Sequence, residues 1–153
     1  MADSRRAGRR RVRDVMVADV VTIEPSASLV RAAMLMRDAN VGMLPVVDRG
    51  RVVGVITDRD VVVRAVAGQA NPAATRVSDC LSEGVIPAHP DWSTEQAIVT
   101  MAQAQVGRLP VLDDDDRLVG VVTLSSMAFR SRDKAVALEA AQEVSRRSAR
   151  EAA

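Results

Sequence analysis

The chain has few aromatic residues, one cysteine and no long apolar run. Trp92 and Phe129 are its only Phe, Trp or Tyr residues, which disfavours nucleic-acid modules that stack bases on aromatic platforms. Cys80 has no second cysteine to pair with, so an internal disulfide is excluded and a reducing, cytoplasmic location is expected. No stretch reaches the ~18 apolar residues that a membrane-spanning helix needs, so no membrane association is expected.

Charge is nearly balanced over the 153 residues, of which 27% are charged, and the net charge is +1. Together with 48% hydrophobic residues, this balance indicates a globular protein without a general attraction to polyanions. The first residues differ because they are rich in arginine. We expect residues 1–11 to form a disordered, solvated arm, and contact with nucleic acid or an acidic partner is the alternative.

The sequence repeats itself. VRDVMVADVVTIEP at 12–25 aligns with VSDCLSEGVIPAHP at 77–90, and DANVGMLPVVD at 38–48 aligns with QAQVGRLPVLD at 103–113. One extra residue in the second copy then aligns RVVGVIT at 51–57 with RLVGVVT at 117–123. A match this long indicates the duplication of a small domain. We therefore expect a first unit at 12–68, a linker at 69–76, a second unit at 77–130 and a helical tail at 131–153.

Each copy begins with an extended stretch and a helix. In the first copy the stretch is 20–23, and apolar residues then recur at helical spacing from Leu29 to Ala39. In the second copy Val85 and Ile86 form the stretch, and the following helix starts at Ser93, which has capping-box spacing to Gln96.

Two short strands and a second helix complete each copy, which gives the order β-α-β-β-α. The strands are joined by turns at 48–50 and at 113–116. In the first copy the last helix is expected from about Thr57 to Ala67, with Gly68 as its C-terminal stop. Its VVVRAV run is rich in β-branched residues, which favours a well-buried helix because local propensity alone would not choose one.

Residues 54–60, GVITDRD, lead from a strand into this helix. Free backbone N–H groups and the helix dipole favour an anion there, and Thr57 adds a hydroxyl donor. Asp60 lies on the same helix face and can accept two hydrogen bonds from a ribose diol. The alternative is a helix cap, since Thr-x-x-Asp is close to a capping box. Gly54 would admit a closely approaching ligand or a neighbouring backbone.

Taken in order, these segments resemble the tandem cystathionine-β-synthase (CBS) domain pair, or Bateman module. The resemblance rests on VRDVM at 12–16, TIEP at 22–25, GMLPVVD at 42–48, GRLPVLD at 107–113 and GVITDRD, and covers roughly residues 12–130. It implies an α+β fold of two β-α-β-β-α units that are related by a pseudo-twofold axis and packed through their sheets, commonly in a homodimer. It also implies adenosyl ligands, such as AMP, ADP, ATP, S-adenosylmethionine or NAD, in the cleft between the units, with no required cofactor.

The resemblance favours ligand binding over a mere cap at GVITDRD. The adenine is expected to lie on a wall formed by Val20, Val21, Thr22, Pro45 and Ile56, although these are also ordinary core positions. Arg108 stands where the first copy has Met43, and we expect it to reach a phosphate held by the first copy; an ordinary exposed arginine is the alternative. The candidate ligand-binding residues are Thr57, Asp60, Ile56, Arg59, Val20, Val21, Thr22, Pro45 and Arg108.

The second copy, GVVTLSS at 120–126, departs from this pattern because Ser126 replaces the aspartate. A serine lacks the charge-assisted hydrogen bonds that a carboxylate makes to a diol. We expect a second, weaker site formed by Thr123, Ser126, Val122 and Pro110.

No nucleophile–base constellation or metal-ligand set is recognisable in the sequence, so an enzyme is not expected. The favoured function is a non-catalytic module that senses an adenosyl ligand and passes a change of shape to a partner or within a dimer. The alternative is a structural or interaction protein, a CBS dimer with vestigial clefts. Its partner would be a protein or, through the Arg-rich arm, nucleic acid, which the composition disfavours.

Overall fold

The computed structural model describes residues 10–130, 138, 141–142 and 145–146. These residues form two compact units, each with one small antiparallel sheet and helices. The β1–β2 unit consists of residues 19–85 and 114–118, and the β3–β4 unit consists of residues 10–18, 86–113 and the described residues from 119 onward. The mixed helix and strand class predicted from the sequence is confirmed. Most of the arm expected at 1–11 and of the tail expected at 131–153 lies outside the described residues.

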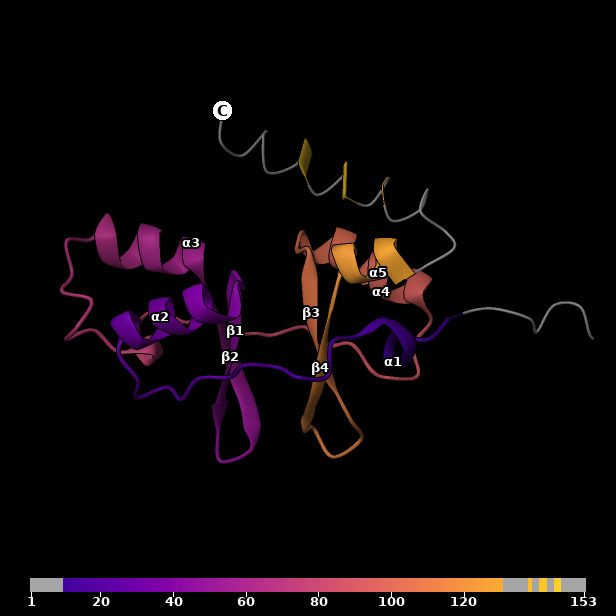
Figure 1. Ribbon diagram of the computed structural model, residues 1–153, viewed down its shortest axis with the longest axis horizontal. Helices are drawn as coiled ribbons and strands as arrows, with labels where there is room; N and C mark the ends of the chain where they lie inside the picture. Colours follow the sequence, from indigo (N-terminus) through magenta and orange to yellow (C-terminus); the bar gives the residue numbers. More distant parts are fainter. Residues whose placement is uncertain (1–9, 131–137, 139–140, 143–144, 147–153) are drawn as a thin grey trace, which may run out of the picture. The chain divides into compact units, whose positions relative to one another are not determined.

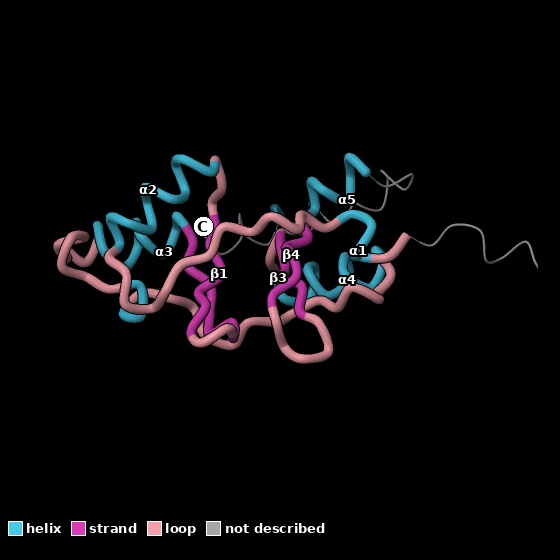
Figure 2. The backbone as a smooth tube through the Cα atoms, turned by 60° about the horizontal axis from the view of Figure 1, so that its bottom comes forward, coloured by secondary structure: helices cyan, strands magenta, loops and turns pink. Residues whose placement is uncertain are grey.

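The β1–β2 unit is built on an antiparallel hairpin of β1 (Met43–Asp48) and β2 (Arg51–Thr57), joined by the predicted turn. Arg49 and Gly50 both have positive φ, at 50° and 81°, which matches the two-residue turn that follows the twist of a hairpin. Figures 1 and 2 both show α2 (Leu29–Ala39) and α3 (Asp58–Asp60) on the same side of this hairpin.

Helix α2 has the predicted bounds because its N-terminus is capped and one of its faces is apolar. The Ser28 hydroxyl accepts a hydrogen bond from the Arg31 N–H at 3.2 Å, as an N-cap residue does. The buried face of α2 packs against the hairpin and against the short helix η2 (Val77–Asp79). The core of this unit comprises Ile23, Leu29, Ala32, Met36, Leu44, Val46, Ile56, Ala65, Val77 and Cys80.

The first strand of each copy is shorter than predicted. Ile23 alone forms a parallel bridge, donating its N–H to the Pro45 carbonyl at 3.1 Å and accepting from the Val47 N–H at 2.9 Å. In the second copy the corresponding bridge is made by Ala88 and Val111. The extended stretch expected at 20–23 is therefore corrected to its last residue, Ile23, and the stretch expected at 85–86 is corrected to Ala88, two residues further on, because only these residues exchange hydrogen bonds with their hairpins.

The last helix of the first copy continues from α3 as a π-helix, η1 (Val61–Val66). Only Ala65 of η1 is fully buried, whereas Val62, Val63 and Val66 are 58%, 55% and 62% exposed. The expectation of a well-buried helix is wrong here, because one helix face covers the core and the small Ala65 occupies it.

The end of η1 also differs from the sequence prediction. The left-handed residue is Gln69, with φ of 54°, and not Gly68. A Cβ on Gly68 would lie 2.5 Å from the Arg64 carbonyl oxygen. Gly68 is therefore suited to this position by the close approach of the preceding helical turn rather than by its freedom of φ.

The β3–β4 unit repeats the arrangement. It contains α1 (Val12–Val15), α4 (Thr94–Ala104), β3 (Arg108–Leu112), all of β4 (Leu118–Thr123) except Leu118, and α5 (Leu124–Arg130). The predicted start of α4 is confirmed, since the Ser93 hydroxyl accepts from the Gln96 N–H at 3.1 Å. Its core comprises Val12, Val15, Ala88, Ala97, Ile98, Met101, Leu109, Val111, Val122 and Met127. Within the part of the chain that the structure describes, no helix has the length and apolar character to cross a membrane.

The compact units do not coincide with the sequence repeats, because the first residues of each repeat lie in the other unit. Residues 10–18 belong to the β3–β4 unit and residues 77–85 to the β1–β2 unit. Val17 pairs with Val121 on β4, and Ser82 pairs with Val55 on β2. Each hairpin is thus contacted along its second strand, β2 or β4, by a segment from the start of the other repeat.

Two glycines at equivalent strand positions make this pairing possible. A Cβ on Gly54 would lie 2.6 Å from Leu81 Cδ1 and 2.8 Å from the Ser82 carbonyl oxygen. A Cβ on Gly120 would lie 2.7 Å from Met16 Sδ. Of the two alternatives considered for Gly54, a ligand or a neighbouring backbone, the structure shows the neighbouring backbone.

Candidate ligand site at the start of α3

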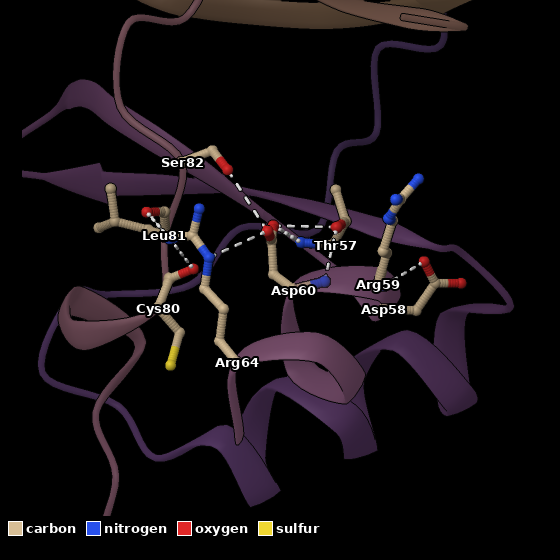
Figure 3. Close-up of polar contacts among 8 residues, drawn as sticks. All are labelled: Thr57, Asp58, Arg59, Asp60, Arg64, Cys80, Leu81 and Ser82. Atoms are coloured by element: carbon tan, nitrogen blue, oxygen red, sulfur yellow. Dashed lines mark hydrogen bonds and ion pairs between the residues drawn. The ribbon is translucent and has the colours of Figure 1, made fainter. Parts of the chain in front are cut away.

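Thr57 and Asp60 form a reciprocal pair at the junction between β2 and α3 (Figure 3). The Asp60 N–H donates to Thr57 Oγ1 at 3.1 Å, while the Thr57 N–H and hydroxyl both donate to Asp60 Oδ2 at 2.9 Å. This is a capping box with aspartate in the third position. The cap alternative weighed for Thr-x-x-Asp is therefore realised in the structure.

The other N–H groups of this helical turn also have acceptors. The Asp58 N–H donates to the Gly42 carbonyl at 3.1 Å, and the Arg59 N–H donates to Asp58 Oδ1 at 2.8 Å. The expectation of free N–H groups for an anion is wrong for this conformation. An anion that used them would first have to displace these internal acceptors.

The second oxygen of Asp60 contacts a segment distant in sequence. The Ser82 hydroxyl donates to Asp60 Oδ1 at 3.4 Å, and Arg64 Nε lies 3.8 Å from the same oxygen. Arg64 Nη1 also donates to the carbonyls of Cys80 and Leu81, at 3.1 and 3.0 Å. Figure 3 shows the guanidinium between the carboxylate and these two carbonyls.

Sequence reasoning missed Ser82 and Arg64 as neighbours of Asp60. Arg64 follows Asp60 by one helical turn, so its spacing carried a signal. Ser82 carried none of its own, because it lies in the other sequence repeat. The signal in the sequence was Gly54, since a glycine within a strand allows a neighbouring backbone to approach closely.

The chemistry around Asp60 is that of a carboxylate that accepts hydrogen bonds from hydroxyl and amide donors and forms an ion pair with a guanidinium. The Asp60 side chain is only 13% exposed. A ligand with two adjacent hydroxyl groups offers donors of the same type as Thr57 and Ser82 and can replace them. The arrangement therefore suits a diol as well as it suits a cap.

The other candidate residues of the first site differ in accessibility. Ile56 is fully buried in the core and Pro45 is buried in β1, whereas Val20 is partly buried and Val21 and Thr22 are exposed. The bridge between Ile23 and the Pro45 carbonyl places Ile23, the residue after Thr22, beside β1. The Ile56 side chain packs inward, so its backbone is the part that a ligand could contact.

The two candidate arginines are both exposed. Arg59 lies in the first turn of α3. Arg108 begins β3 in the β3–β4 unit, and its expected role in binding a phosphate stays a prediction.

The second copy repeats the reciprocal cap without a carboxylate. The Thr123 N–H donates to Ser126 Oγ at 3.0 Å, and the Ser126 N–H donates to Thr123 Oγ1 at 2.9 Å. The Ser126 hydroxyl proton is used as well, since it points to the Thr123 carbonyl at 2.9 Å. Val122 and Pro110 are buried, so the weaker site expected here presents mainly these two hydroxyls.

Cys80 is 4% exposed and belongs to the core of the β1–β2 unit. Burial, followed by the charge of Asp79, raises the pKa of its thiol above the ordinary value. The thiol is therefore held in its unreactive protonated form. The described residues contain no group of three or more His, Cys, Asp or Glu side chains arranged to hold a metal ion.

Two small α+β units with the same helix-capping motif define a tandem domain pair. The family model for the CBS domain matches residues 12–66 and 77–132. The chain belongs to the CBS domain family, as the sequence motifs predict.

Relatives of known name and structure support this assignment. The CBS domain-containing protein YhcV of Bacillus subtilis is 40% identical over 117 residues, which cover 76% of this chain and 82% of YhcV. Inosine-5′-monophosphate dehydrogenase of Methanocaldococcus jannaschii is 33% identical over 120 residues, or 78% of this chain but only 23% of that enzyme. The CBS domain pair of protein MJ0100, solved with 5′-methylthioadenosine and S-adenosyl-L-methionine, has a TM-score of 0.72 and 28% identity over 80% of this chain and 95% of that one.

Proposed function

We propose that the chain is a non-catalytic regulatory module that binds an adenosyl ligand at the start of α3. The observation that carries this proposal is the Asp60 carboxylate, which is mostly shielded and surrounded by hydrogen-bond donors at the end of a strand. A solved CBS pair of similar fold binds two adenosyl compounds, which supports the choice of ligand class. AMP, ADP, ATP, NAD and S-adenosylmethionine all carry the ribose that this carboxylate would recognise.

In the proposed complex the ribose diol donates to Asp60 and replaces internal donors at its two oxygens. Thr57 stays beside the ribose and turns its hydroxyl to the ligand. The adenine lies along the backbone of residues 20–22 and Pro45. Arg59 is the cation of this unit that would meet a phosphate, and a ligand without phosphates would not require it. The proposal assigns no chemical step to the chain, so the ligand leaves unchanged.

The second copy is proposed to bind the same class more weakly. Ser126 occupies the position of Asp60 and already uses its hydroxyl in the cap. A neutral acceptor contributes less to a diol than a carboxylate does. One strong site in each chain is therefore expected.

Calorimetric titration of AMP, ATP, NAD and S-adenosylmethionine into the wild type and the Asp60→Ser variant tests the proposal. Serine at position 60 can keep the helix cap, as Ser126 does in the second copy, while the carboxylate is lost. We expect at least one of these ligands to bind the wild type, and Asp60→Ser to weaken it by about tenfold or more, given the usual cost of a lost charged hydrogen bond.

The matched control is Asp58→Ser, which removes the same charge from an exposed position in the same turn. It should bind like the wild type. Equal weakening by both variants would reduce the effect to net charge, and absence of binding by all four compounds would overturn the proposal.

The alternative is a structural or protein-interaction module, and a specific observation favours it. The helix η1 exposes Val62, Val63 and Val66, and exposed apolar groups that gather on one element are typical of interaction surfaces. We propose that η1 takes part in a homodimer in the cytoplasm. Dimer formation through η1 is compatible with ligand binding. It would be the main function if no ligand binds at Thr57 and Asp60. The Arg-rich arm is the proposed contact should the partner be nucleic acid.

A further inference from the structure

We infer that Asp60 acts as a latch. It holds residues 80–82 against the rest of the β1–β2 unit, and a ligand that binds its carboxylate releases them. This inference rests on the proposed adenosyl function and adds the structural response to it. Residues 80–82 are hereafter called the latch segment. The inference starts from the contact of Asp60 Oδ1 with Ser82 of this segment, because the proposed ligand would bind the same carboxylate.

The latch segment is held in place by backbone and side-chain contacts. Ser82 and Val55 exchange two backbone hydrogen bonds, at 2.9 and 3.1 Å. Arg64 holds the carbonyls of Cys80 and Leu81. The contacts that run through the carboxylate are the Ser82 hydroxyl at 3.4 Å and Arg64 Nε at 3.8 Å, both to Asp60 Oδ1.

The carboxylate also orients Arg64. Its guanidinium has Nε facing Asp60 and Nη1 facing the two carbonyls (Figure 3). A planar guanidinium presents its donors in a fixed geometry. Loss of the Asp60 contact therefore frees the group to rotate, which weakens its hold on the Cys80 and Leu81 carbonyls.

The ligand and the latch segment compete for Asp60 because both of its carboxylate oxygens already contact donors. Oδ2 already accepts from the Thr57 N–H and hydroxyl, and Oδ1 is the oxygen that faces Ser82 and Arg64. A ribose diol needs at least one of these positions. A diol at Oδ1 would displace the Ser82 hydroxyl, so the ligated and latched states are separate conformations whose populations the ligand shifts.

The latch segment contains its own reporter, since Cys80 is the only cysteine of the chain and is 4% exposed. Alkylation of the full chain by iodoacetamide measures how often this thiol is uncovered. A ligand that only stabilises the folded state slows such labelling. Release of the latch segment predicts the opposite, an acceleration of about threefold or more on adding saturating 5′-methylthioadenosine. This uncharged probe leaves phosphate contacts out of the measurement.

The variant Ser82→Ala removes one competitor for Asp60 without touching the ligand side. We expect it to bind 5′-methylthioadenosine about two- to fivefold more tightly, in line with the net value of one long hydrogen bond. We also expect faster labelling of Cys80 before ligand is added. Ser78→Ala is the matched control, because Ser78 is exposed near the same segment and its hydroxyl makes none of the contacts described above; it should change neither quantity.

Hydrogen exchange at the Val55 and Ser82 amides gives a second measurement and should rise when ligand is bound. Binding that leaves labelling and exchange unchanged or slower would overturn the latch while leaving the proposed function intact. Weaker binding by Ser82→Ala would also overturn it, since Ser82 would then assist the ligand. Failure of every adenosyl compound to bind the wild type would overturn the proposed function, and the ligand-driven latch with it.

Discussion

Thr123 and Ser126 cap the start of α5 with hydroxyl groups alone. Each residue donates its N–H to the side chain of the other, at 3.0 and 2.9 Å. Thr57 and Asp60 make the same exchange at the start of α3, but with a carboxylate. The fold therefore needs a short hydrogen-bonding side chain at this position and does not need a charge. The charge of Asp60 is available for another purpose.

The first prediction compares two substitutions of Asp60. Asp60→Ser should leave the free energy of unfolding within ~1 kcal/mol of the wild type, because serine can rebuild the cap. Asp60→Ala should cost about 1–2 kcal/mol, since the Thr57 N–H and hydroxyl lose their acceptor. Urea unfolding without ligand measures both. Equal losses for the two variants would contradict the cap equivalence inferred from Ser126.

The second prediction concerns the glycine beside the latch segment. Gly54→Ala should destabilise the chain by about 1–3 kcal/mol, as overpacking does, because its methyl group would lie 2.6 Å from Leu81 Cδ1 and 2.8 Å from the Ser82 carbonyl oxygen. Gly107→Ala is the matched control, since its nearest neighbour would be Leu124 Cδ1 at 3.9 Å. It should change the free energy of unfolding by less than ~0.5 kcal/mol. If Gly54→Ala left the free energy of unfolding unchanged, the latch segment would be able to move away from β2 without loss of stability.

The third prediction is a pH dependence at the start of the chain. Arg11 donates to Asp91 at 2.6 Å and Arg13 also donates to it, and these contacts lower the pKa of Asp91 below its ordinary value of 3.8. A lowered folded-state pKa adds stability above the unfolded pKa, and this contribution is lost as the pH falls through the folded pKa.

We therefore expect Asp91→Asn to reduce the thermal midpoint at pH 7 slightly and to have no effect once the pH falls below the lowered pKa of Asp91, where the wild-type carboxyl is protonated. The Asp91 contacts are solvent-exposed, so the difference should shrink in high salt. Thermal unfolding from pH 7 to pH 2.5 measures it. A difference that grows as the pH falls would have the wrong sign.

The fourth prediction tests η1 as an interaction surface. Val66→Glu places a charge on a residue that is 62% exposed, so the folded unit should tolerate it. A homodimer that buries η1 should dissociate, with at least a tenfold weaker association, because a charge in an apolar interface stays unpaired. Light scattering after size-exclusion chromatography measures the mass. Arg51→Glu, exposed on β2 next to the hairpin turn, is the control and should leave the mass unchanged.

The regular elements could be predicted because their signals are local. The apolar spacing from Leu29 to Ala39 and the caps at Ser28 and Ser93 lie within a few residues of the helices they define. The turn at 48–50 is equally local. The π-helical form of η1 and the exposure of its valines were not predictable in this way, since they depend on which face the sheet leaves uncovered.

The candidate site was predictable only in part. The Thr57–Asp60 pair follows from three-residue spacing, and its copy at Thr123 and Ser126 follows from the repeat. The acceptor of the Asp58 N–H, the Gly42 carbonyl, and the contact with Ser82 follow from tertiary structure, which brings Ser82 to Asp60 across 22 residues of sequence. No pattern in a single sequence distinguishes a carboxylate that binds a ligand from one that accepts hydrogen bonds from its own chain.

The placement of residues 10–18 and 77–85 has a genetic consequence. A gene cut between the repeats, near residue 70, would encode a first half whose β2 lacks Ser82 and a second half whose β4 lacks Val17. Neither product would carry all the segments of a complete unit. Two single-repeat polypeptides could complete each other only by association, whereas in the continuous chain the same exchange of segments is intramolecular.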